Sequence, residues 1–137
     1  MIKDLDVSWS YTKKNIKNIL KKYNFLVLSV SPSQDRIDDN YKLQLIKKED
    51  IDEKYIKIDD NEIVKRIEFI NYVRYSYNKL TKDERKIIYW TYFDKENNYD
   101  DRFIANNLGF SLGYYYIKKK ETLIRFAFSL GIEVNNK

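Results

Sequence analysis

Three pairs of neighbouring aspartates are the residues whose types and spacing could support enzymatic chemistry. The pairs are Asp38–Asp39, Asp59–Asp60 and Asp100–Asp101. Carboxylate oxygens could hold a magnesium ion, but the 137-residue chain has no histidine and no cysteine, which excludes the commonest general base and all thiolate chemistry. The second and third pairs also precede predicted helices, where acidic residues complement the helix dipole. We therefore predict a protein that is not an enzyme and that has no cofactor and no metal site.

A different chemistry is suggested by tyrosines and lysines nearer the C-terminus. Tyr114 and Tyr116 precede a run of lysines at 118–120. Lysines bind DNA phosphates without sequence preference, and tyrosine hydroxyls also donate to phosphates. A net charge of +5 and a pI near 9.1 permit a nucleic-acid partner. Two plainer alternatives stay open, namely a solvated lysine run and tyrosines that pack against Tyr99 or Phe103.

A helix-turn-helix is the element that would position these side chains. When Asp101 is counted as the first of twenty positions, the motif expects a small fifth residue, a glycine at the ninth position and apolar residues behind both helices. The residues at the diagnostic positions are Ile104, Ala105, Leu108, Gly109, Phe110, Tyr115 and Lys118. Lys118 departs from the apolar pattern, so we expect Ile117 to share its buried role. We also expect Gly109 to have a positive φ, because it follows directly on the first helix.

The second helix of this pair carries most of the predicted DNA contacts. Ser111 is a suitable N-cap and Gly131 a suitable end, so the helix should run to about Leu130. Its first turn should approach base edges in the major groove, while Arg102 contacts the DNA backbone from the helix before. The predicted DNA-binding residues are Arg102, Ser111, Leu112, Gly113, Tyr114, Tyr116, Ile117, Lys118, Lys119 and Lys120.

Three more helices are predicted before this one within residues 59–137. The acidic stretch at 59–61 starts a helix whose apolar residues recur at steps of three and four up to Leu80. Thr81 and Glu84 form a capping box for the next helix, which should end near Phe93. A polar loop at 94–99 leads to the helix that ends at Leu108. These patterns predict an all-α fold in which residues 59–137 form a helix-turn-helix DNA-binding domain.

Residues 1–58 are predicted to form a basic helix and a linker. The segment from Val7 to Gln34 has no acidic residue, and its apolar residues recur at helical spacing, which predicts a helix over 12–28 with Thr12 as the N-cap. Its lysine face is either solvated or in contact with phosphates or an acidic partner. Ser31-Pro32-Ser33 should end the helix. Alternating apolar residues at 41–45 indicate a short extended segment in the linker.

Short motifs at both ends of the chain resemble known transcription proteins. The stretch from Leu80 to Leu130, with "LTKDERKIIYWTYF" and "DDRFIANNLGFS", resembles region four of bacterial sigma factors. "IANNLGFS", Tyr115-Tyr116, Lys119, Leu123 and the ending "FAFSLGIEV" look like the ArpU/RinA-type late transcriptional regulators of phages and prophages of Gram-positive bacteria, as does "TKKNIKNILKKYNFL" near the N-terminus. The resemblance skips Ser31 to Asp59. It implies a sigma region four-like helix-turn-helix in a sequence-specific DNA-binding regulator, an activator of late phage or prophage genes.

The expected partners are double-stranded DNA, RNA polymerase and a second copy of the chain in a homodimer. There is no apolar run of transmembrane length and no apolar secretory segment at the N-terminus, and the lack of cysteine suits a reducing compartment. We therefore expect a cytoplasmic protein with no membrane partner. Two alternative functions stay open, namely a phage small terminase-like DNA-packaging subunit and a sigma-like module that grips RNA polymerase without DNA.

Overall fold

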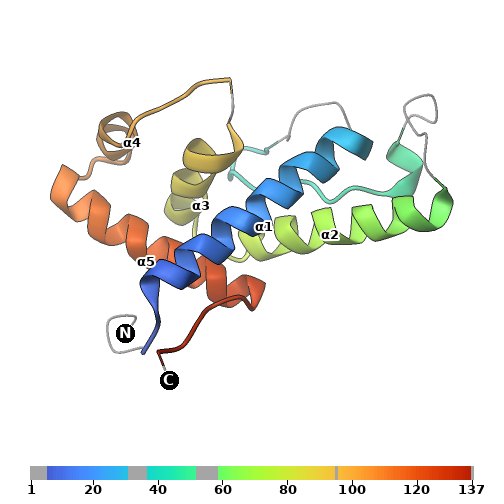
Figure 1. The fold of residues 1–137 in the computed structure, drawn as a ribbon. Coiled ribbons are helices and arrows are strands. Elements are labelled where there is room, and N and C mark those ends of the chain that lie inside the picture. The colour runs from blue at the N-terminus through green and yellow to red at the C-terminus, as the bar shows by residue number, and fades with distance from the viewer. Residues whose placement is uncertain (1–5, 31–36, 52–58, 95, 137) are drawn as a thin grey trace.

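The protein has an all-α fold, seen in a computed structural model that describes residues 6–30, 37–51, 59–94 and 96–136 (Figure 1). The described residues form no strand, and two isolated β-bridges join Val7 to Asn135 and Ile37 to Leu43. The predicted fold class is therefore confirmed. The elements in chain order are α1 (Trp9–Val30), the 3-10 turn η2 (Lys48–Asp50), α2 (Asp60–Asn78), α3 (Lys82–Ile88), the π-helical turn η4 (Tyr89–Phe93), α4 (Asp101–Leu108) and α5 (Leu112–Leu130).

Helix α1 begins earlier than its sequence pattern predicts. It starts at Trp9, so Thr12 lies inside the helix and is not the N-cap that we expected. The hydroxyl of Thr12 is buried and accepts a hydrogen bond from the backbone N–H of Val134 at 3.0 Å. Since the two residues are far apart in the chain, local sequence could not reveal this role. The predicted helix end at Ser31-Pro32-Ser33 lies outside the described residues.

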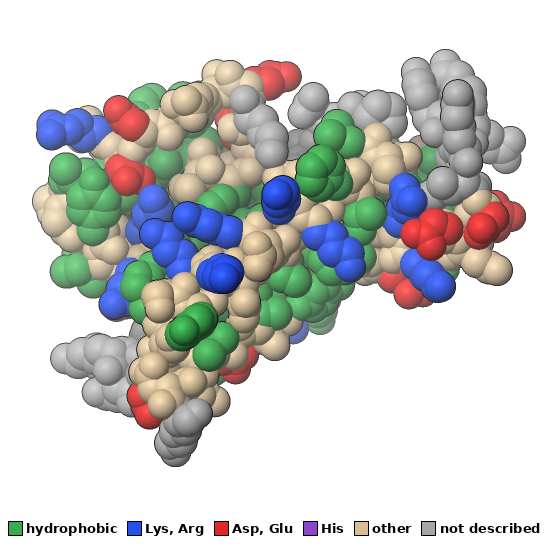
Figure 2. Space-filling view, in the orientation of Figure 1, with side chains coloured by type: hydrophobic (Ala, Val, Ile, Leu, Met, Phe, Trp, Pro, Cys, Tyr) green, Lys and Arg blue, Asp and Glu red, His purple; other side chains and the backbone are tan. Residues whose placement is uncertain are grey.

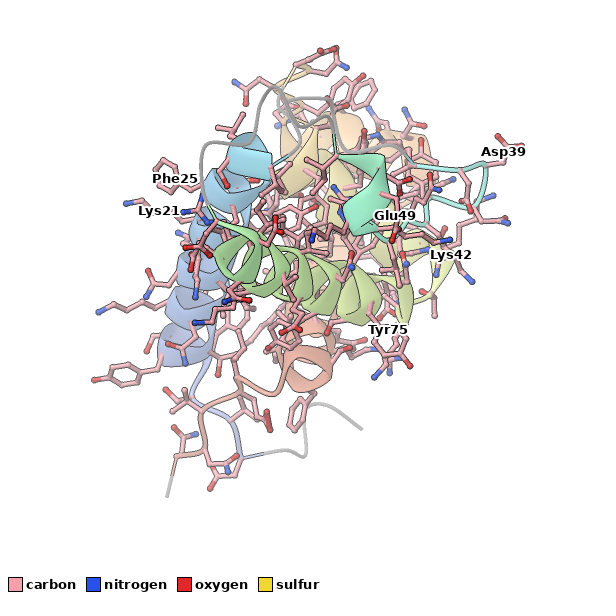
Figure 3. All side chains as sticks on the ribbon, turned by 90° about the vertical axis from the view of Figure 1, so that its right-hand side faces the viewer. Lys21, Phe25, Asp39, Lys42, Glu49 and Tyr75 are labelled. Atoms are coloured by element: carbon pink, nitrogen blue, oxygen red, sulfur yellow. The ribbon has the colours of Figure 1, made fainter. Side chains whose placement is uncertain are left out.

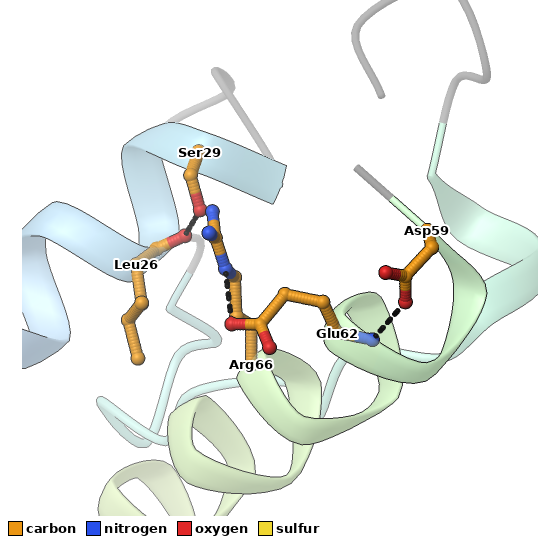
Figure 4. A network of polar contacts seen from close by, with 5 residues as sticks. All are labelled: Leu26, Ser29, Asp59, Glu62 and Arg66. Atoms are coloured by element: carbon orange, nitrogen blue, oxygen red, sulfur yellow. Dashed lines mark hydrogen bonds and ion pairs between the residues drawn. The ribbon is translucent and has the colours of Figure 1, made fainter. Parts of the chain in front are cut away.

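Helix α2 begins where the acidic stretch predicts. The carboxylate of Asp59 accepts a hydrogen bond from the backbone N–H of Glu62 at 2.9 Å, and Glu62 in turn accepts from Arg66 Nε at 3.2 Å. Figure 4 shows both contacts beside the last turns of α1, where the hydroxyl of Ser29 donates to the carbonyl of Leu26 at 2.7 Å. The carboxylate of Asp59 therefore serves as a helix cap, as expected for acids at this position.

Helix α3 begins with the predicted capping box, and its helical backbone continues through η4 to Phe93, the predicted end. Thr81 Oγ1 accepts from the backbone N–H of Glu84 at 3.3 Å, and Glu84 Oε1 accepts from the N–H of Thr81 at 2.9 Å. The other carboxylate oxygen of this buried glutamate pairs with Arg125 Nε at 2.8 Å, which ties α3 to α5. After Ile88 the helix widens into η4, where the N–H of Asp94 donates to the carbonyl of Tyr89 at 2.8 Å.

Most of the buried apolar side chains belong to two clusters. The smaller core consists of Ile87, Trp90, Ile104, Ala105 and Tyr115. The larger core takes residues from both sides of the predicted boundary at residue 58, which itself lies outside the described residues. Its members are Ile16, Leu20, Tyr23, Val27, Val30, Leu43, Ile51, Ile63, Ile67, Ile70, Val73, Tyr77, Leu80, Ile88, Phe93, Leu123, Phe126, Ala127 and Leu130.

Residues 37–51 lie along α2 and are held there by two asparagine side chains. The amide of Asn78 donates to the carbonyl of Leu43 and accepts from its N–H, both at 2.8 Å. Asn71 binds Ile46 in the same two-point way, at 2.8 and 2.7 Å. The stretch at 41–45 that we predicted to be extended forms no strand, and Tyr41 has a positive φ of 60°. The backbone groups of Leu43 and Ile46 bind side chains of α2 instead.

Candidate nucleic-acid interface

A three-residue turn joins α4 to α5 and sets their relative direction. Gly109 has φ +73°, as predicted, and the N–H of Phe110 reaches back to the carbonyl of Ala105 at 2.9 Å. This pairing satisfies a carbonyl that the end of α4 would leave free. Ser111 then caps α5, because its hydroxyl accepts from the N–H of Tyr114 at 3.2 Å. The predicted N-cap is confirmed, and the turn between the two helices consists of only Gly109, Phe110 and Ser111.

The smaller core holds α4 and the first half of α5 together. Ile104, Ala105 and Tyr115, which occupy positions four, five and fifteen of the twenty-position pattern, are all buried here beside Ile87 and Trp90. The small side chain of Ala105 leaves room for the two helices to meet. Burial of these positions fixes which side of α5 faces inward and which side faces solvent.

A polar link reinforces this contact between α4 and α5. The hydroxyl of Tyr115 donates to Asp101 Oδ1 at 3.1 Å, and Lys119 Nζ donates to the same oxygen at 3.0 Å. Burial raises the pKa of the Tyr115 hydroxyl, and the negative charge of Asp101 raises it further, so the hydroxyl keeps the proton that it donates. Lys119 therefore belongs first to an internal ion pair, which makes it less available to a phosphate than its neighbours.

The outward face of α5 carries apolar and aromatic side chains. Ile117 is 61% exposed, so our expectation that it shares a buried role is wrong. Tyr114 and Tyr116 are 51% and 50% exposed. Gly113 is also exposed, and a Cβ built there would meet no atom within 4 Å. We expected Leu112 to be exposed toward DNA, but it is half-buried and packs against the smaller core.

The tyrosines do not take the packing partners that we considered for them. Tyr99 and Phe103 stack on each other, with ring centroids 4.1 Å apart. The rings of Tyr114 and Phe110 instead meet edge to face, with their centroids 4.8 Å apart. The ring centroids of Tyr116 and Tyr115 are 5.7 Å apart. Both exposed tyrosines keep a free side.

The remaining predicted residues differ in their surroundings. Lys118 is half-exposed and Lys120 is exposed. The ammonium group of Lys120 lies 5.5 Å from the centre of the Trp9 ring, which places it at the start of α1. Arg102 is exposed in the first turn of α4, on the helix that precedes this face. Nothing in the sequence pattern indicated the contact with Trp9, because it joins opposite ends of the chain.

Two other classes of site find no support in the described part of the chain. Its acidic residues form no group of three that could hold a metal ion. None of the helices built from described residues is long and apolar enough to cross a membrane.

Comparison with known proteins adds no family: no protein-family model, no curated protein and no solved structure matches this chain.

Proposed function

We propose that this chain is a cytoplasmic DNA-binding protein, not an enzyme, and that it regulates transcription through the exposed face of the first half of α5. One observation carries the proposal. The short capped turn and the buried contacts of Ala105 and Tyr115 hold α5 in one orientation, in which Tyr116, Ile117 and Lys120 face outward. A recognition helix held by its partner helix in this way is what a sigma region four-like helix-turn-helix would need.

The chemistry of this face suits a major groove. Ile117 offers methyl groups to thymine, and Tyr116 offers a hydroxyl to a base edge or a phosphate. Gly113 leaves the backbone of the first turn open to close approach. Few of these groups select a base strongly, so we propose that a second copy of the chain or RNA polymerase supplies part of the specificity. An activator of late phage or prophage genes remains our proposal for the biological role.

The affinity test uses fluorescence anisotropy on random duplex DNA at several salt concentrations. We expect Lys118→Ala and Lys120→Ala each to lower the slope of log affinity against log salt by roughly 0.9, the value for a single phosphate neutralised by the protein. Lys119→Ala is the matched control and should change the slope less, because its ammonium group is paired with Asp101. Absence of binding to any duplex at low salt would refute the proposal.

The specificity test compares a selected site with random DNA. Sequencing the genomic fragments that the protein retains would define the site. Tyr116→Ala and Ile117→Ala should lower the ratio of specific to non-specific affinity by roughly 1–3 kcal/mol for each favourable interaction with a base that the substitution removes. Thermal melts should stay near the wild-type value because both side chains are about half or more exposed. An unchanged ratio in both variants would place sequence reading elsewhere.

Exposed aromatic and aliphatic groups also favour a second candidate function. Such residues are enriched where proteins bind proteins, so the same face could grip RNA polymerase without DNA. Purified bacterial RNA polymerase, titrated against the wild type and Ile117→Ala, separates the two. Polymerase binding that disappears in this variant, together with no duplex binding by the wild type, would establish the second candidate. A large ring in light scattering would instead favour the packaging subunit.

A further inference from the structure

A row of lysines on α1 forms a second basic surface. Lys13, Lys17 and Lys21 follow one another at four-residue intervals, which places them on one side of the helix about 6 Å apart. Lys17 and Lys21 are exposed, and Lys13 is half-exposed. In Figure 3, Lys21 points to the opposite side of the molecule from Lys42 and Tyr75. Lys21 therefore lies on the face seen in Figure 2, and the four-residue spacing places Lys13 and Lys17 on the same side of α1.

The row meets α5 at the indole of Trp9. The ammonium group of Lys13 lies 5.8 Å from the centre of this ring, and that of Lys120 lies 5.5 Å from it. One aromatic ring thus holds a cation from each of two helices. Figure 2 shows Lys and Arg side chains gathered over the region where α1 crosses α5. The lysine row and the outward face of α5 are therefore parts of one surface.

This surface collects positive charge that its neighbours do not neutralise. No acidic residue occurs between Val7 and Gln34. Among the described residues, no ion pair involves any lysine of the row or Lys120. Lys17 and Lys21 line an open hollow of about 460 Å³, in which the one carboxylate among the described lining residues is that of Asp94. Like charges held close together repel, and the attraction of an anion bound between them would offset that repulsion.

We propose that the lysine row of α1 binds backbone phosphates of the same DNA duplex that α5 contacts. This inference rests on the proposed function. From Lys13 to Lys21 the row spans about 12 Å along the helix, while phosphates follow one another at about 3.4 Å per strand along the duplex axis. The row is thus long enough to meet several phosphates. It adds affinity and fixes the orientation of the duplex across α1, and it reads no sequence.

The test compares two variants with the same change in charge. The first replaces Lys13, Lys17 and Lys21 with glutamine, and the control replaces Lys42, Lys79 and Lys82 with glutamine. Lys42 lies on the opposite side from the row in Figure 3, and Lys79 lies over the ring of Tyr75 on that same side. On random duplex DNA we expect the first variant to lower the log–log salt slope by roughly 0.9 per lysine. The control should keep a slope close to the wild-type value.

Removing the carboxylate beside the row should act in the opposite direction. We expect Asp94→Asn to bind random duplex more tightly than the wild type at low salt, because one source of repulsion toward the phosphates is removed. Asparagine retains an oxygen that can accept from Asn97, the present partner of Asp94. Weaker binding or no change would count against phosphates near Lys17 and Lys21.

Two further controls separate folding and the parent proposal from this inference. Replacing the row with arginine keeps the charge and should keep the slope. If the glutamine triple melts early, Lys17→Gln with Lys21→Gln replaces it, because these two side chains are exposed. A slope that falls in Lys120→Ala but not in the α1 variants would overturn this inference alone. Failure of the wild-type chain to bind any duplex would overturn the proposed function and this inference with it.

Discussion

The larger and smaller cores hold the protein together by different means. The larger core joins α1, α2 and the second half of α5 through many aliphatic side chains. The smaller core has five buried residues. The rings of Tyr41 and Tyr99 meet Trp90 edge to face, with ring centroids 5.5 and 6.3 Å from that of Trp90. It also depends on the polar link of Tyr115 and Lys119 to Asp101. The contrast indicates that the larger core is the more stable part of the protein. The smaller core, which carries the candidate interface, is less strongly held.

Two helices connect these regions. In α3, Ile87 enters the smaller core and Ile88 enters the larger one. In α5, Tyr115 belongs to the smaller core and Phe126 to the larger one. Because each helix is rigid and contributes to both cores, packing in the larger core also determines the position of the candidate interface. The contrast therefore predicts that damage to each core has a different consequence.

The largest effect should come from matched cavities in the two cores. Ile70→Ala, in the larger core, should lower the free energy of unfolding by about 2–5 kcal/mol, because it removes fully buried methyl groups. Ile104→Ala should cost less, since α4 can shift to fill the space, yet it should weaken DNA binding more. Urea unfolding and anisotropy measure the two quantities. An equal drop in DNA affinity in both variants would show that the cores are not distinct in function.

A smaller effect is expected at the two left-handed glycines. Gly109 and Gly131 have φ of +73° and +74°, so valine at either should cost between about 1 and 2 kcal/mol of stability through backbone strain. No atom lies within 4 Å of a Cβ at either site, so steric overlap should add little. Only Gly109→Val should also lower DNA affinity. A wild-type melting temperature in Gly109→Val would show that the turn adapts without strain.

Alkaline titration tests the larger core through the buried hydroxyl of Tyr77. Burial raises the pKa of Tyr77, an effect that the positive charge of Arg85 partly offsets. In the unfolded chain tyrosine ionises near pH 10, so stability should be complete below that pH and should fall as pH rises above it. Tyr77→Phe should make this fall shallower. It should also cost about 1 kcal/mol at neutral pH, because the hydroxyl donates to the carbonyl of Tyr41 at 2.6 Å. Urea midpoints between pH 8 and 11 measure both effects.

The smallest effect should come from the polar link of the smaller core. Lys119→Ala should cost less than about 1 kcal/mol, because Lys119 and Asp101 are 24% and 33% exposed and solvent screens their attraction. Lys118→Ala provides a matched control in the neighbouring residue. A double-mutant cycle with Asp101→Asn would isolate the coupling. Equal destabilisation by Lys118→Ala and Lys119→Ala would mean that the ion pair adds nothing specific.

Local signals made most helix boundaries predictable. Asp59, Thr81, Ser111 and Gly109 act on backbone groups within a few residues, so the sequence around each contains the whole interaction. For the same reason the order of the helices and the all-α class followed from the sequence alone.

The missed features depend on residues far apart in the chain. Thr12 binds Val134, and Trp9 meets Lys120, so neither contact has a local pattern. The exposure of Ile117 depends on the rotation of α5, which the packing of Tyr115 determines. In the same way, the sequence alone cannot show that Lys119 pairs with Asp101 and is not part of a solvated lysine run.

The asparagine contacts along α2 also set which changes the neighbouring segment can accept. Asn71 and Asn78 are two helical turns apart, about 10.5 Å, while Leu43 and Ile46 are about 10 Å apart in extended chain. The two lengths match, and both contacts use only backbone groups of the segment. Substitutions at 44 and 45 should therefore be tolerated, whereas inserting or deleting one residue between Leu43 and Ile46 would detach one of the pairs. The helix thus constrains the length of this stretch more strictly than its composition.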